Sequence, residues 1–163
     1  CFESRPMNEG RLFAAALASA GVEVRYAVDA AAGALVPDCD AVILGADSVG
    51  DAGVVNKIGS TALAHAARAA GVPVYVLADE TKMLPTGFPQ VLDDDRPGEE
   101  VWDAPGGVEV WNRYFEVTPV ENVTAVVSEA GVMDVEQTLR QRQAIALPPG
   151  LRAWARTRGR DDA

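Results

Sequence analysis

An α/β fold with a mostly parallel sheet is the architecture that this sequence predicts, on three observations. Residues 41–44 and 73–77 are short apolar runs of the length expected for buried strands. Residues 58–70 lie between them with helical spacing, and Gly71 follows in the position that commonly ends a helix. Strands that alternate with helices of about 10–15 residues are typical of parallel sheets, because parallel neighbours need a crossover connection.

The elements before the first of these strands follow from the same reasoning. Residues 8–20 carry their apolar side chains on one stripe, which predicts a helix that ends at Gly21. Residues 22–28 alternate in the manner of a strand, and Asp29 is expected to cap a short helix through residue 35.

The pattern breaks over residues 85–107, a proline-rich segment that we expect to be a long exposed loop. Extended pieces are then predicted at residues 108–111 and 114–117, and a strand at 124–127. Asp134 is expected to cap a helix over residues 135–145.

Size and composition favour one domain. With 163 residues, 48% of them hydrophobic, the chain is long enough for a single core. We assign residues 1–147 to that domain and residues 148–163 to an Arg-rich tail. The chain begins without Met, so we expect that its N-terminus is cut and that something preceded it.

Several classes of partner are disfavoured by the sequence. No apolar run is long enough for a bilayer, and the net charge of −10 argues against direct binding of nucleic acid. Two cysteines make no disulfide framework, and no cluster suggests a metal, so we expect no metal, no cofactor and a cytoplasmic location. Cys39 is interpreted as a small buried hydrophobe.

Asp47 is the candidate catalytic residue. It follows an apolar strand within Gly45-Ala46-Asp47, at the strand end where open α/β sheets bind ligands. A carboxylate there can act as a general acid or base, or simply cap the loop.

Asn56 and Lys57 are the leading candidates for binding a phosphate group. The sequence predicts that Lys57 lies in the first turn of the helix that follows, where a cation and free backbone amides suit an anion, although Lys57 can also be a plain surface lysine. Arg5, Glu9, Gly10 and Lys82 complete the candidate site, although Arg5 can instead pair with Glu3 and Lys82 can be a solvated surface residue.

These motifs occur in an order that resembles the translation initiation factor 2B alpha/beta/delta family. The likeness runs from Glu3 to about Gln143 and rests on five segments. They are Glu3-Ser-Arg-Pro-Met-Asn-Glu-Gly-Arg11, Gly45-Ala-Asp47 with Asn56-Lys-Ile-Gly-Ser60, Pro73-Val-Tyr-Val, Phe115-Glu-Val-Thr-Pro119, and Val127-Ser-Glu-Ala-Gly-Val132. The family also contains methylthioribose-1-phosphate isomerase and ribose-1,5-bisphosphate isomerase.

The resemblance implies a Rossmann-like three-layer domain that forms the carboxyl-terminal half of a family member and assembles as a homodimer or higher oligomer. It implies that Asp47 is the catalytic aspartate, that Asn56 and Lys57 bind substrate, and that Gly10 is a turn glycine. The ligand it implies is a phosphorylated pentose or a nucleotide. The family's catalytic cysteine lies upstream, in or near a helical N-terminal half, and no residue of this chain matches it.

Two residues depart from the isomerase pattern. Glu9 stands where the isomerases usually carry Gln, and a carboxylate repels phosphate instead of donating to it. Ser48 stands where Arg is frequent.

The sequence therefore leaves three readings open. The first is a factor-2B-like protein with an aldose 1-phosphate isomerase type of site that is incomplete in this chain. The second is a non-catalytic regulatory or dimerisation module of the same family. The third is a different phosphosugar isomerase, such as ribose-5-phosphate isomerase.

Overall fold

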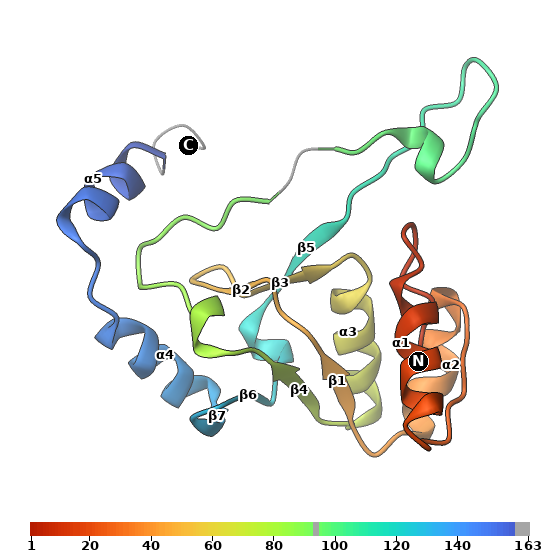
Figure 1. Ribbon diagram of the computed structural model, residues 1–163, viewed down its shortest axis with the longest axis horizontal. Helices are drawn as coiled ribbons and strands as arrows, with labels where there is room; N and C mark the ends of the chain where they lie inside the picture. The colour runs from red at the N-terminus through yellow and green to blue at the C-terminus, as the bar shows by residue number, and fades with distance from the viewer. Residues whose placement is uncertain (93–94, 159–163) are drawn as a thin grey trace.

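A mostly parallel sheet forms the centre of the computed structural model, which describes residues 1–92 and 95–158 (Figure 1). Among these residues its strand order is β1-β4-β6-β7. The parallel strands are β1 (Val42–Leu44), β4 (Val74–Leu77) and β6 (Ala125–Ser128), and β7 (Gly131–Asp134) runs antiparallel to β6. The predicted α/β class with a mostly parallel sheet is confirmed.

A smaller antiparallel sheet follows β1, and of its strands only the extended piece at residues 114–117 was predicted. Residues 108–111, also predicted as extended, form no strand. It contains β2 (Ser48–Val49), β3 (Val54–Lys57) and β5 (Phe115–Thr118) in the order β2-β3-β5. β3 pairs along its length with β5, which is about sixty residues further along the chain. Sequence patterns report local periodicity, so a four-residue strand that depends on so distant a partner escaped the prediction.

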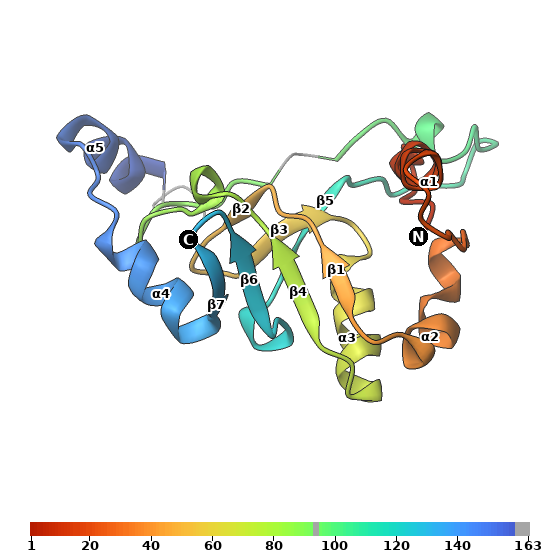
Figure 2. The same ribbon diagram turned by 60° about the horizontal axis from the view of Figure 1, so that its bottom comes forward.

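Helices lie on one face of the parallel sheet and at the two ends of the molecule. The α-helices of the described residues are α1 (Glu9–Ser19), α2 (Ala32–Leu35), α3 (Ser60–Ala70), α4 (Val135–Ala144) and α5 (Pro149–Arg158). Single 3₁₀ turns occur as η1 (Asp29–Ala31), η2 (Val36–Asp38), η3 (Glu80–Lys82), η4 (Gly98–Glu100) and η5 (Val120–Asn122). Figure 2 shows α1 and α2 at one end of the molecule and α4 and α5 at the other.

The helix predicted after Asp134 is confirmed with its cap. The Asp134 carboxylate accepts the Gln137 amide at 2.7 Å, and the Gln137 side chain accepts the Asp134 amide at 2.9 Å. This reciprocal arrangement satisfies two backbone donors at the start of α4. Residues 149–158 of the Arg-rich tail form α5, in which Trp154 stacks near Phe88 with ring centroids 5.5 Å apart. Residues 159–163 lie outside the described part.

The core lies on one face of the parallel sheet. Its sheet residues are Val42, Leu44, Val74, Val76 and Val126, all buried. Ala64 and Ala67 of α3 are fully buried in the same cluster, and their small side chains let the helix approach closely.

The opposite face of the parallel sheet is largely exposed in the described part of the chain. The strand register puts Ile43 beside Tyr75, and Leu77 in line with Val132 through Val127. Ile43 and Val132 are each 65% exposed and Leu77 is 49% exposed. Such a contiguous apolar area is a feature of surfaces that are covered by another polypeptide.

Three local predictions near the N-terminus were wrong. Residues 22–28 form no strand and contribute a single bridge, between Ala27 and Phe2. The Asp29 carboxylate accepts the backbone amides of Ser4 and Arg5, at 2.9 and 2.8 Å, instead of capping a helix. Cys39 is exposed, because it lies between η2 and β1, outside the packed core.

Arg142 anchors the turn between β2 and β3 to α4. Its side chain is 1% exposed and donates to the Asp51 carboxylate and, at 2.8 Å, to the Leu84 carbonyl. The Asp51 carboxylate also accepts the Gly87 amide at 2.7 Å. Partial burial on its own would raise the pKa of Asp51, but the hydrogen bonds from Gly87 and Arg142 outweigh it and hold the pKa below its usual value.

We predict that this contact makes folding stability depend on acid. Because the pKa of Asp51 is lower in the folded than in the unfolded chain, its contribution is complete above the unfolded value and is lost as the pH falls through the folded value. Asp51→Asn should lower the free energy of unfolding at pH 7 by about 1 kcal/mol, a modest value because the carboxylate is half exposed.

Urea unfolding at pH 7 and at pH 3 measures this effect. The difference between the two variants should shrink at the lower pH, because the Asp51 carboxyl of the unfolded wild-type chain becomes protonated there before that of the folded chain. Arg140→Ala, on the same helix but at an exposed position, serves as the control. Equal stability of wild type and Asp51→Asn at pH 7 would contradict the assignment.

Candidate functional site

The candidate site lies where the chain leaves β1. Gly45, Ala46 and Asp47 lead from the parallel sheet into β2, and the antiparallel partner β3 returns beside them. A Cβ atom on Gly45 would lie 3.6 Å from Oδ1 of Asn56, so a side chain there would be in ordinary van der Waals contact with Asn56. The carboxyl end of β1 and the end of β3 are therefore neighbours.

Asp47 presents an exposed carboxylate. Its backbone amide donates to the Val55 carbonyl at 2.8 Å, although the register pairs Val55 with Ser48. Two successive residues thus face one partner, the geometry of a β-bulge, which re-aims a side chain. Within the described residues the carboxylate has no hydrogen-bond or ion-pair partner, which leaves it free to meet a ligand.

Lys57 lies beside Glu9 and two aromatic rings. Its ammonium forms an ion pair with the Glu9 carboxylate and lies 4.9 Å from the ring centroid of Tyr114 and 5.7 Å from that of Phe115. The Lys57 side chain is 19% exposed and that of Glu9 is 52% exposed. The rings attract the cation through their π faces but accept no strong hydrogen bond from it.

Asn56 and Lys57 leave β3 on opposite faces, as successive residues of a strand do. Asn56 donates to the Ser60 hydroxyl at 2.9 Å, and that hydroxyl donates to the Lys57 carbonyl at 2.7 Å. The Asn56 side chain therefore supports the turn into α3, while Lys57 faces Phe115, its partner in the register. No direct contact joins Lys57 to Asp47 in the described residues.

The start of α3 is already supplied with a negative charge. Lys57 ends β3 and the helix begins at Ser60, so the prediction that Lys57 lies in the first helical turn was wrong. One oxygen of the Glu116 carboxylate accepts the backbone amides of Gly59 and Thr61, both at 2.8 Å. Glu116 thus accepts hydrogen bonds from the same backbone amides that were predicted to bind a phosphate group.

The remaining predicted residues lie at several places. Arg5 donates through its guanidinium to the Val101 carbonyl at 3.1 Å, and the alternative pair with Glu3 does not form among the described residues. Gly10 is buried in the first turn of α1, where a Cβ would lie 1.8 Å from the Phe2 carbonyl oxygen.

Lys82 closes η3, beyond β4, and is part of a separate charged turn. The Thr81 hydroxyl donates to the Asp79 carboxylate, and this bond and the nearby charge of Lys82 lower the pKa of Asp79. No contact joins Lys82 to Lys57 or Asp47 within the part that the structure describes.

Sequence reasoning missed the role of the segment before β5. The Tyr114 hydroxyl donates to the Glu100 carboxylate at 2.6 Å, and this hydrogen bond raises the pKa of Tyr114. The Arg96 guanidinium lies over the Tyr114 ring, 4.9 Å from its centroid. Residues 95–113 therefore extend from the sheet toward the end of the molecule that holds α1 (Figure 1). The aromatic pair Tyr114-Phe115 beside a charged loop was the available signal.

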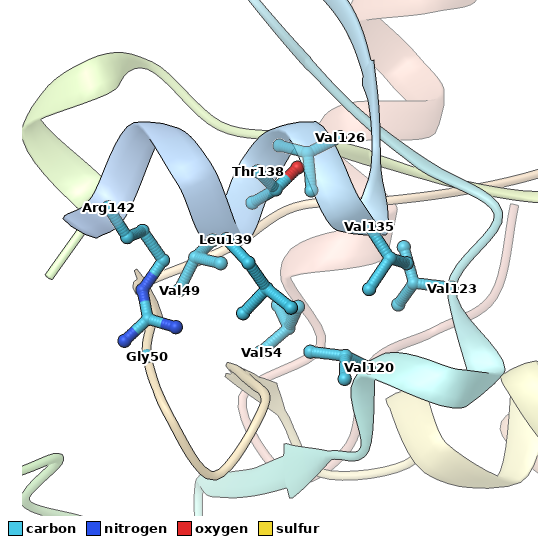
Figure 3. A pocket seen from close by; sticks show the side chains of 10 residues that line it. All are labelled: Val49, Gly50, Val54, Val120, Val123, Val126, Val135, Thr138, Leu139 and Arg142. Atoms are coloured by element: carbon cyan, nitrogen blue, oxygen red, sulfur yellow. The ribbon is translucent and has the colours of Figure 1, made fainter. Parts of the chain in front are cut away.

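The cavity shown in Figure 3 is a different feature. It is lined by valine side chains and by residues of α4, among them Arg142, and its volume is about 10 Å³. That is room for about one water molecule, too little for a sugar phosphate. Across residues 1–92 and 95–158, no group of His, Cys, Asp or Glu side chains is arranged to hold a metal ion. No helix in these ranges is long and apolar enough to span a bilayer.

Comparison with known proteins gives consistent results. Methylthioribose-1-phosphate isomerase of Ostreococcus lucimarinus is 39% identical over 147 residues, covering 82% of this chain and 40% of the relative. Ribose 1,5-bisphosphate isomerase of Haloferax volcanii is 39% identical over 142 residues, covering 79% of this chain and 42% of the relative. The chain thus spans less than half the length of the curated relatives it matches.

Solved structures agree with the sequence relatives. The delta subunit of translation initiation factor eIF-2B from A. fulgidus superimposes with a TM-score of 0.76 and 32% identity, over 85% of this chain and 45% of that one. The 5-methylthioribose 1-phosphate isomerase of Pyrococcus horikoshii superimposes with a TM-score of 0.76 and 30% identity, over 86% of this chain and 43% of that one. A sequence model described as the initiation factor 2 subunit family matches residues 1–135. This chain belongs to the initiation factor 2 subunit family.

Proposed function

We propose that this chain carries the sugar-phosphate site of an aldose 1-phosphate isomerase type of protein, with Asp47 as the acid–base group and Lys57 as the phosphate contact. The observation that carries the proposal is the Asp47 carboxylate, which is exposed, follows the carboxyl end of a parallel strand and has no partner among the described residues. Relatives named as isomerases of methylthioribose 1-phosphate and ribose 1,5-bisphosphate support the choice of ligand.

The chemistry explains the need for a carboxyl group. The anomeric oxygen of a sugar 1-phosphate is esterified, so the ring opens only if the ring oxygen receives a proton as its bond to C1 breaks. Isomerisation then needs hydrogen to move from C2 to C1 while the C2 hydroxyl becomes a carbonyl. Asp47 would donate or accept one of these protons. A second group is required, and by resemblance it would be a cysteine supplied by preceding sequence.

Assembly and location belong to the same proposal. A helical half that precedes this segment would complete the catalytic site, and the complete protein would work in the cytoplasm as a homodimer or larger oligomer. Arg5, Glu9, Gly10, Asn56 and Lys82 would shape the surroundings of the ligand. In the structure, Asn56 orders the turn that follows Lys57, and Gly10 fixes the turn that holds Glu9.

Binding of a phosphorylated pentose tests the proposal directly. Titration calorimetry of this chain with ribose 5-phosphate, ribose 1,5-bisphosphate and AMP should detect weak binding of at least one ligand. Lys57→Ala should weaken it by about tenfold, because a charge-assisted contact from a mostly buried ammonium contributes roughly 1.4 kcal/mol. Arg140→Ala removes a positive charge elsewhere and should leave the affinity unchanged. Absence of heat with every ligand would refute the binding claim.

A substitution at Asp47 separates function from structure. Because its carboxylate is exposed and makes no contact among the described residues, Asp47→Asn should change the free energy of unfolding by less than about 0.5 kcal/mol. In a complete protein with measurable isomerase activity, the same change should abolish turnover. Thermal and urea unfolding provide the check, and an unfolded variant would show that Asp47 is a structural cap.

A non-catalytic dimerisation module is the second candidate function. The exposed apolar face at Ile43, Leu77 and Val132 favours it, since a symmetric dimer through this face would bury those side chains in both copies. Sedimentation should then give a dimer for this chain, and Ile43→Lys should shift it to monomer, with Leu12→Lys on α1 as the matched control. A monomer at high protein concentration would exclude this function.

A further inference from the structure

The ion pair between Glu9 and Lys57 places a carboxylate on the ammonium that the proposed function assigns to phosphate. We infer that Glu9 determines the anion specificity of this site: it is a built-in competitor that a phosphate group must displace from Lys57. The inference rests on the proposed function and goes beyond it, because it assigns to Glu9 the control of phosphate affinity.

The backbone around Glu9 is fixed, so this contact is a built feature of the fold. Asn8 has a left-handed conformation with φ 58°, and its side-chain amide donates to the Pro6 carbonyl at 3.0 Å. On the other side, Gly10 donates to the Glu3 carbonyl at 3.3 Å and has no room for a side chain against Phe2. These contacts hold the start of α1 in place, so Lys57 is freed by rotation of a side chain and not by movement of the helix.

The Lys57 ammonium is flanked by two aromatic rings and by the Glu9 carboxylate. Two ring faces, of Tyr114 and Phe115, flank the ammonium, and its side chain is only 19% exposed. Glu9 is 52% exposed, so its side chain has space to swing outward into solvent. A phosphate group that binds the Lys57 ammonium must share it with this carboxylate or displace the carboxylate.

Charge decides which ligands tolerate such a neighbour. A phosphate group and a carboxylate repel each other when both approach one ammonium, and the repulsion grows with the charge of the ligand. A sugar hydroxyl instead can donate to Glu9 while accepting from Lys57. The pair therefore weakens phosphate binding and leaves the neutral part of a sugar unaffected, and the same contact makes affinity for phosphate sensitive to salt.

Glu9→Gln tests this inference, because the amide keeps the shape of the side chain and removes its charge. Calorimetry with ribose 5-phosphate should show that Glu9→Gln binds about three- to tenfold more tightly than wild type in low salt. The gain should shrink in high salt, where exposed charges are screened, and it should be lost in the Lys57→Ala background. Glu23→Gln removes an identical charge from an exposed position in another segment and should not change affinity.

The outcomes distinguish this inference from the function on which it rests. If wild type binds ribose 5-phosphate and Glu9→Gln binds it equally or less well, Glu9 is no competitor, while the phosphosugar site stands. A gain that persists in the Lys57→Ala background also overturns the inference, since the effect would not pass through that ammonium. If neither wild type nor Glu9→Gln binds any phosphorylated pentose, both the proposed phosphosugar site and the proposed effect of Glu9 on its affinity are refuted.

Discussion

The close approach of α3 to the parallel sheet is the constraint on which the rest of the structure depends. Ala64 and Ala67 leave no exposed surface, and the helix lies directly on the valines of β1 and β4. Because α3 is fixed there, the turn that precedes it is fixed as well, and with it the end of β3. The position of Lys57 is thus set by apolar packing that begins seven residues further along the chain, at Ala64.

Two groups near this turn carry positive charge or polarity, the backbone amides at the start of α3 and the Lys57 ammonium, and each contacts a carboxylate. Glu116 accepts the amides at the start of α3, and Glu9 pairs with the ammonium of Lys57. Each arrangement stabilises the folded chain without a ligand, since an unpaired donor or cation in a partly buried position is unfavourable. Asp47 is the exception, because its carboxylate is exposed and has no partner in the described residues. That contrast separates carboxylates that hold the fold from one that has no partner among the described residues.

The sequence predicted the parallel part of the fold well, and the reason is local. The strands at β1, β4 and β6 are short apolar runs, and α3 and α4 carry their own end signals, Gly71 and the Asp134–Gln137 cap. The antiparallel sheet was missed because β3 exists only by pairing with β5. For the same reason the position of Lys57 was assigned to a helix, and residues 22–28, whose alternation resembles a strand, find only one bridge.

By itself the sequence determined the α/β class, the family and the identity of the candidate groups, because each is encoded in periodicity or in ordered motifs. Only the tertiary structure decided which groups meet. Glu9 and Lys57 are 48 positions apart in sequence and form an ion pair, while the neighbours Asn56 and Lys57 diverge because a strand alternates its side chains. Partners so distant are chosen by the packing of whole elements, and no local pattern records that choice.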